Sequence, residues 1–182
     1  MHNTAIPSSE ECQEIMKNNN MLQNIVEHSE QVTRVAVAIV DNLKDNIRID
    51  KDLVIAASLL HDITKTRAID TKEPHDITGA QELRKLELYA IADIVEEHVK
   101  LKNFNMNSEL EAKEIVYYAD KRVMHSTIVS IDERIDDIIS RYAFNPALRD
   151  QIYLRNGVTL QLEEKISDCM KRDIDEVINE IS

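Results

Sequence analysis

The stretch Leu53-Val54-Ile55-Ala56-Ala57-Ser58-Leu59-Leu60-His61-Asp62 joins an apolar run to a histidine and a carboxylate. It predicts a helix over residues 51–65, with Asp50 or Asp52 as its N-cap. Adjacent residues of a helix point about 100° apart, so His61 and Asp62 reach one ion only near a helix end or an irregular turn. A carboxylate offers two oxygens and can bridge two metal ions, whereas a histidine gives one nitrogen to one ion.

The rest of the chain predicts an all-α protein. Only two glycines and three prolines occur in 182 residues, so helix breakers are scarce. Apolar residues at helical spacing predict further helices at about 21–43, 75–88, 89–101, 108–125, 131–141 and after Gly157, separated by a loop at 67–74 and a break at Asn145-Pro146. The last helix would present Leu160, Leu162, Ile166, Met170, Ile174 and Ile178 to the core, or alternatively to a second copy in a homodimer.

Histidines and acids recur on the inner faces of these helices. His28 lies between Ile25 and Val32, His98 shares a face with Ile94, and Asp120 is four residues after Val116. A polar group on an apolar face needs a partner. Each alone is expected to be a satisfied core residue, but several together with His61-Asp62 favour a shared divalent metal ion.

A second His-Asp pair, His75-Asp76, does not end an apolar run. Its Asp76 has the position of a helix cap. His75 is either a further metal ligand or an exposed loop residue.

The composition narrows the partners and the compartment. The formal net charge of −12 disfavours nucleic acid polymers and anionic membranes. Basic residues nevertheless follow three of the ligand segments, which favours a small phosphorylated substrate, unless charge is simply frequent everywhere. The length fits one domain, which we divide into an N-terminal segment (1–20), a core (21–125) and C-terminal helices packed on it (126–182). Two distant cysteines, with neither a signal peptide nor a membrane span, indicate reduced thiols in a cytoplasmic protein.

The ordered pattern His…His-Asp…His…His…Asp resembles the HD-domain superfamily of metal-dependent phosphohydrolases. It is met by His28, His61-Asp62, His75, His98 and Asp120, with the flanking stretches Leu59-Leu60-His61-Asp62-Ile63-Thr64-Lys65, His75-Asp76-Ile77-Thr78-Gly79-Ala80 and Ala119-Asp120-Lys121. The resemblance covers residues 22–125 and looks most like the bacterial HD enzymes that cleave dinucleoside tetraphosphates. Thr64 and Asp76 stand where glycine is usual, which bears on the shape of the pocket and on the substrate.

The resemblance implies a single-domain helical bundle with the metal site between helices. It implies that His28, His61, Asp62 and Asp120 bind a first metal ion, and that His75 and His98 serve a second one bridged by Asp62. One or two divalent ions are expected, and imidazole and carboxylate ligands suit iron, manganese, nickel, cobalt and zinc alike.

The predicted function is hydrolysis of a phosphoester or phosphoanhydride in a small, nucleotide-like substrate through a metal-bound hydroxide. Asp62 and Lys65 are the predicted catalytic residues. The predicted substrate-binding residues are Lys65, Arg67, Lys100, Lys121 and Arg122. Two alternatives remain open at this point, namely an HD-fold di-iron oxygenase and a non-catalytic module that senses nucleotides or binds a partner.

Overall fold

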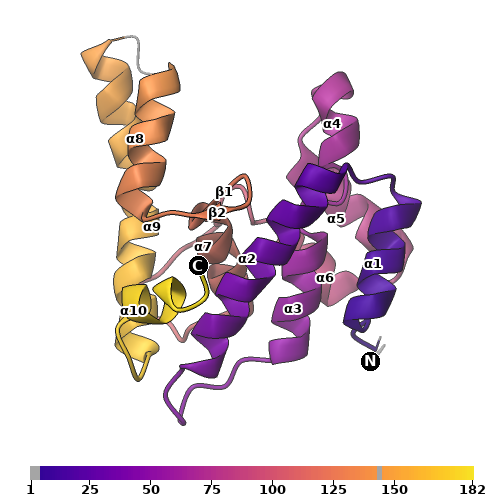
Figure 1. Ribbon diagram of the computed structural model, residues 1–182, viewed down its shortest axis with the longest axis horizontal. Helices are drawn as coiled ribbons and strands as arrows, with labels where there is room; N and C mark the ends of the chain where they lie inside the picture. Colours follow the sequence, from indigo (N-terminus) through magenta and orange to yellow (C-terminus); the bar gives the residue numbers. More distant parts are fainter. Residues whose placement is uncertain (1–4, 143–144) are drawn as a thin grey trace.

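Helices dominate the computed structural model, which describes residues 5–142 and 145–182 (Figure 1). The all-α prediction is confirmed, because the described chain adds only one two-stranded hairpin to its helices. The elements are α1 (Ser9–Asn18), α2 (Gln23–Asp41), α3 (Lys51–Leu60), α4 (Lys65–Thr71), α5 (His75–Lys85), α6 (Tyr89–Val95), α7 (Ala112–Lys121), β1 (Val123–Met124), β2 (Thr127–Ile128), α8 (Ile131–Tyr142), α9 (Pro146–Cys169) and α10 (Ile174–Asn179). Within the described residues, none of the helices has the length and apolar character that a bilayer span requires.

Helix α3 lies at the centre and contacts α1, α2, α6 and α7. Asp50 caps its N-terminus, since its side chain accepts a hydrogen bond from the Leu53 amide at 3.1 Å. The last turn and a half is buried on every side, from Ala56 to Leu60. Burying one such leucine side chain is worth about 1.5–3 kcal/mol, so α3 anchors the surrounding helices to one core.

The predicted helices are too long where they approach the ligand residues. α3 ends at Leu60 and α6 ends at Val95. The predicted loop at 67–74, in contrast, is partly helical, because α4 continues to Thr71. α7 begins at Ala112 after the N-cap Glu111, so the prediction that Ser108 starts this helix is wrong. The Ser108 hydroxyl instead accepts a hydrogen bond from Lys165 at 3.0 Å. Tertiary contacts, which helical periodicity does not report, set these boundaries.

The C-terminal part differs most from the prediction. A hairpin of β1 and β2 follows α7, and its turn residue His125 has a positive φ of 59°. Helices α8 and α9 pack side by side as a helical hairpin at one end of the molecule (Figure 1). Gly157 lies inside α9 rather than before it, and Leu160, predicted to face the core, is 42% exposed. Ile174 and Ile178 are buried as predicted, but they belong to the separate helix α10.

A buried ion pair fastens α9 to α7. Lys165 Nζ lies 2.8 and 2.9 Å from the two carboxylate oxygens of Glu114, and both side chains are 4% exposed. The same ammonium also donates to the Asn105 carbonyl at 3.1 Å and to the Ser108 hydroxyl. Because the Lys165 ammonium binds acceptors in both segments, it holds the loop before α7 as well as α7 against α9.

Lys165→Met should lower the free energy of unfolding by about 3–5 kcal/mol, because it leaves the Glu114 carboxylate buried without its counter-charge. Urea denaturation followed by circular dichroism measures this change. The double variant Glu114→Leu/Lys165→Met should recover much of the loss. A Lys165→Met protein as stable as the wild type would contradict the structural role of this pair.

Candidate metal centre

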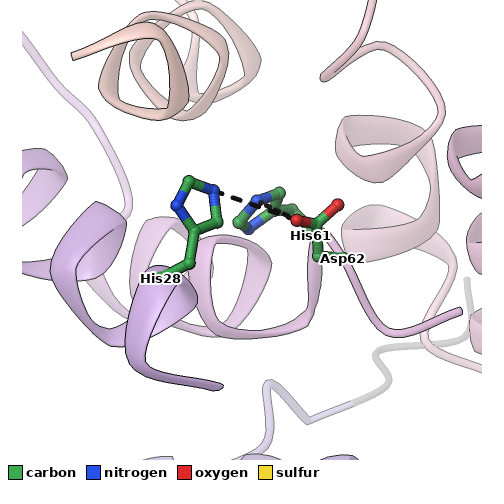
Figure 2. A group of neighbouring side chains, drawn as sticks. All are labelled: His28, His61 and Asp62. Carbon is green, nitrogen blue, oxygen red and sulfur yellow. Dashed lines mark ion pairs between the residues drawn. The ribbon is translucent and has the colours of Figure 1, made fainter. Parts of the chain in front are cut away.

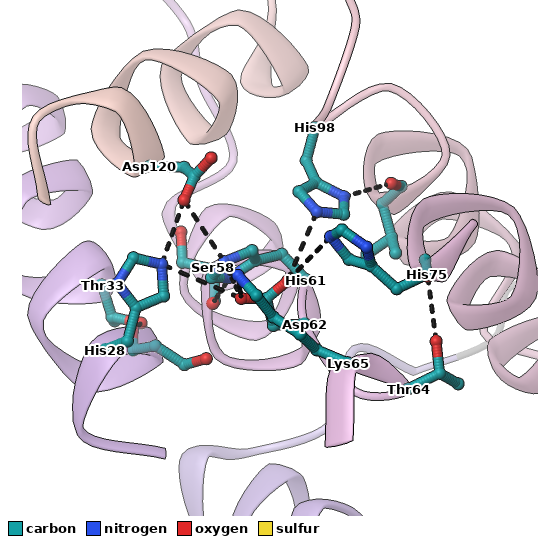
Figure 3. A network of polar contacts seen from close by, with 12 residues as sticks. His28, Thr33, Ser58, His61, Asp62, Thr64, Lys65, His75, His98 and Asp120 are labelled. Atoms are coloured by element: carbon teal, nitrogen blue, oxygen red, sulfur yellow. Dashed lines mark hydrogen bonds and ion pairs between the residues drawn. The ribbon is translucent and has the colours of Figure 1, made fainter. Parts of the chain in front are cut away.

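Six side chains from five segments converge below the C-terminal end of α3 (Figure 3). His61 and Asp62 occupy the turn that directly follows α3. The other four come from the second turn of α2, the first turn of α5, the bend after α6 and the last turn of α7; they are His28, His75, His98 and Asp120. All six predicted metal ligands thus lie together.

The Asp62 carboxylate stands between two pairs of histidines. Its Oδ2 lies 3.3 Å from His61 Nε2 and 3.9 Å from His28 Nε2, the first group (Figure 2). Its Oδ1 lies 3.2 Å from His75 Nε2 and 3.5 Å from His98 Nε2. Two donor sets result, His28–His61–Asp62 and Asp62–His75–His98, which share only Asp62.

These separations suit metal ligation. Two ligand atoms each about 2.1 Å from one ion are at most about 4.2 Å apart, and all four distances to Asp62 fall within that limit. Three of the atoms concerned, His61 Nε2, Asp62 Oδ1 and His98 Nε2, are buried without a hydrogen-bond partner within the described residues. Cations bound in the two donor sets would satisfy all three, so the residues present fit divalent metal ions.

Backbone carbonyls orient three of the imidazoles. His61 Nδ1 donates to the Ser58 carbonyl at 2.7 Å and His98 Nδ1 to the Val95 carbonyl at 2.6 Å, each three residues upstream at the C-terminal end of a helix. His28 Nδ1 donates to the carbonyl of His125 at 2.7 Å. A carbonyl only accepts hydrogen bonds, so each neutral ring is left with a free lone pair on Nε2, directed to the centre.

Asp120 completes the first group. Its Oδ1 lies 3.0 Å from His28 Nε2 and 3.7 Å from His61 Nε2. When the His28 ring is neutral and carries its proton on Nδ1, its Nε2 lone pair faces a lone pair of Asp120 Oδ1. A cation or a proton shared by these two atoms would remove the repulsion. Two lysines flank the carboxylates: Lys65 Nζ lies 2.7 Å from Asp62 Oδ2, and Lys121 Nζ lies 2.6 Å from Asp120 Oδ2.

Charge compensation decides the protonation of the buried groups. Burial alone would raise the pKa of the Asp62 carboxyl, but the imidazoles of His61, His75 and His98 hold it well below its usual range. Burial would lower the pKa of His61, yet the Asp62 and Asp120 carboxylates raise it overall. Burial lowers the pKa of His98. Asp62 is therefore an anion, and both donor sets are arranged around it.

A cavity of about 370 Å³ opens above these ligands. Its lining includes four basic side chains and two acidic ones, a local excess of positive charge in a protein whose net charge is −12. The basic residues are Lys65, Lys121, Arg134 and Arg141. Such a cavity attracts anions. A second cavity of about 420 Å³, near the loop between α2 and α3, contains none of the metal-ligand residues.

The other predicted substrate-binding residues lie away from the cavity lining. Arg67 is paired with Glu73 and Glu82 on the surface. Lys100 is exposed beyond the bend after α6. Arg122 is 2% exposed and is held by the Val129 carbonyl, the Tyr118 hydroxyl and Asp175.

Sequence reasoning missed Arg134 and Arg141, which reach the cavity from α8. It also missed the carbonyl of His125. No motif marks these residues, and their contribution depends on the folding of the C-terminal part over the centre.

Thr64, at one of the two positions where glycine is usual, links the turn that carries Asp62 to the helix that carries His75. Its hydroxyl donates to the His75 carbonyl at 2.9 Å and lies 2.9 Å from the Thr78 hydroxyl. With φ at −103°, its backbone does not require glycine. Thr64 therefore holds the first turn of α5, which carries His75, against the turn that carries Asp62.

We expect Asp62→Ala to remove all bound metal, since this carboxylate serves both donor sets, and His75→Ala to remove about one equivalent from a dinuclear protein. Elemental analysis after reconstitution with Mn²⁺ or Fe²⁺ measures the stoichiometry, and circular dichroism controls for folding. Asp76→Ala, at the neighbouring position, is the matched control and should keep the wild-type content. Full metal occupancy in Asp62→Ala would refute the shared-carboxylate arrangement.

Thr64→Val keeps the volume but removes the hydroxyl that fixes His75. Removing such an outer hydrogen bond costs about 10–100-fold in metal affinity. Titration with Mn²⁺ should locate this loss in one of two sites, the one that His75 serves, and the same loss from both would argue against a role specific to His75.

Comparison with known proteins agrees with the geometry. The HD domain family matches residues 25–124, which contain all six ligand residues. The chain is also 30% identical over 193 aligned positions to the tRNA (cytidine(56)-2'-O)-methyltransferase of Picrophilus torridus. That match covers 97% of this chain and 51% of the relative, so the chain spans about half the length of the curated protein it matches. No solved structure matches. On the family match and the ligand set together, the chain belongs to the HD-domain family.

Proposed function

We propose that this protein is a metal-dependent phosphohydrolase that cleaves a phosphoester or phosphoanhydride in a small, nucleotide-like substrate. One observation carries the proposal: the two donor sets that share Asp62 lie at the base of a cavity lined by four basic side chains. Metal ligands alone fit several chemistries. Their combination with cations placed for an anionic substrate favours phosphoryl transfer.

Divalent ions bound here would supply an activated water near neutral pH and neutralise charge on the phosphoryl oxygens. The residues of the chain orient the reactants. Asp62 joins the two donor sets and Asp120 adds a carboxylate to the first. Lys65 and Lys121 each lie against one of these carboxylates at the cavity wall, from which their ammonium groups can hold phosphoryl oxygens.

The size of the cavity and the net charge of the protein favour a small substrate. A cavity of about 370 Å³ suits a metabolite, and a net charge of −12 disfavours a nucleic acid polymer. The methyltransferase named above acts on tRNA, but this chain matches about half of it. We therefore assign neither the substrate nor the reaction of that enzyme to this chain. Both thiols, Cys12 and Cys169, are free, which supports a cytoplasmic location.

The experiment is a screen of the purified chain, stripped of metal and reloaded in turn with Mn²⁺, Fe²⁺, Co²⁺, Ni²⁺ or Zn²⁺. Substrates are nucleoside mono-, di- and triphosphates, dinucleoside polyphosphates, bis(p-nitrophenyl) phosphate and a tRNA. We expect metal-dependent phosphate release from a small substrate. Lys65→Met should lower kcat/KM about 100-fold, the scale of losing one charge-stabilising group, whereas the matched surface variant Lys72→Met should not.

Two outcomes would overturn the proposal. Metal-dependent oxygen uptake with an organic substrate and no phosphate release would favour a di-iron oxygenase. Nucleotide binding without turnover under every metal would favour a sensing module.

A further inference from the structure

We propose that Arg134 and Arg141 form a second anion subsite, which holds a further phosphate group of the substrate beyond the one at the metal centre. That one phosphate group of the substrate binds at the metal centre rests on the proposed function. The subsite itself rests on the placement of α8.

Both arginines belong to one face of α8. They are seven residues apart, which is close to two turns of helix and about 10.5 Å along its axis. Both line the same cavity as Asp62 and Asp120, although α8 lies outside the matched region 25–124. The helix thus adds two positive charges to the cavity wall.

The contacts of the four basic side chains differ in a way that singles out Arg134. Lys65 and Lys121 are paired with Asp62 and Asp120. Arg141 is paired with Asp137 at 2.8 Å, and its side chain remains 47% exposed. Arg134 Nε, in contrast, is buried and has no hydrogen-bond partner within the described residues.

A buried donor without a partner indicates a missing acceptor. A guanidinium presents a planar fork of donors that matches two phosphate oxygens, and it keeps its charge at all relevant pH values. Arg134 lines the cavity and is not one of the six ligand residues, so we infer that the acceptor it fits is an anionic group of the bound molecule other than the one at the metal centre. The ligand class is therefore a molecule with at least two phosphate groups in series.

The test measures binding rather than turnover. Isothermal titration of the metal-loaded chain with inorganic tripolyphosphate and with orthophosphate compares an anion of three phosphate groups in series with an anion of one. We expect the wild type to bind tripolyphosphate more tightly. Arg134→Gln should weaken tripolyphosphate binding at least 10-fold and orthophosphate binding less than 3-fold, and Arg134→Glu should weaken tripolyphosphate further. Arg141→Gln, at an exposed position that folding tolerates, should weaken tripolyphosphate about 3-fold.

Arg172→Gln is the matched control, because Arg172 is an arginine paired with Glu180 on the surface. It should leave both affinities unchanged. Equal tripolyphosphate affinity in the wild type and in all three α8 variants would overturn the subsite, as would an equal loss for tripolyphosphate and orthophosphate. The readout is an affinity, and any orthophosphate released during the titration is assayed separately, so a failed subsite is distinguishable from a failed phosphohydrolase proposal.

Discussion

A carboxylate that is fully buried at the end of an apolar helix is the constraint on which the structure depends. Asp62 has no exposed surface, and an isolated charge there would be strongly unfavourable. Imidazoles from α2, α5 and the bend after α6 compensate it, together with Lys65 from the start of α4. Because each partner comes from a different element, those elements must all meet at the end of α3. The packing of these helices and the geometry of the metal centre therefore depend on the same contacts to Asp62.

The ends of the helices do part of this work. The last carbonyls of a helix lack intrahelical partners and need donors. In α3 and α6 such a carbonyl, of Ser58 and of Val95, accepts from the Nδ1 of a histidine three residues further on. The same bond satisfies the backbone and fixes the tautomer that leaves Nε2 free. The turns that shorten these helices are thus what makes the histidines usable as ligands.

The C-terminal part both supports the centre and completes it. Arg122, two residues after Asp120, is held by the Tyr118 hydroxyl and by Asp175, so it joins the end of α7 to α10. The β-hairpin supplies the carbonyl that orients His28, and α8 supplies two arginines to the cavity. The family match ends before α8. The two arginines that α8 adds to the cavity therefore lie outside the residues that define the family match.

The sequence by itself predicted the all-α class and the central helix, because helical periodicity is a local property of the chain. The sequence also indicated five of the six converging residues, as polar groups at helical spacing or directly after an apolar run, and His75 through its place in the ordered family motif. It misplaced the helix ends at Leu60, Val95 and Ala112, and it did not indicate the hairpin, the continuation of α9 through Gly157 or the two arginines of α8. Tertiary structure alone decided which oxygen of Asp62 faces which histidines and which basic residues line the cavity. The physical reason is that these features depend on contacts between segments up to about a hundred residues apart, such as His28 with the carbonyl of His125, and no local pattern encodes such contacts.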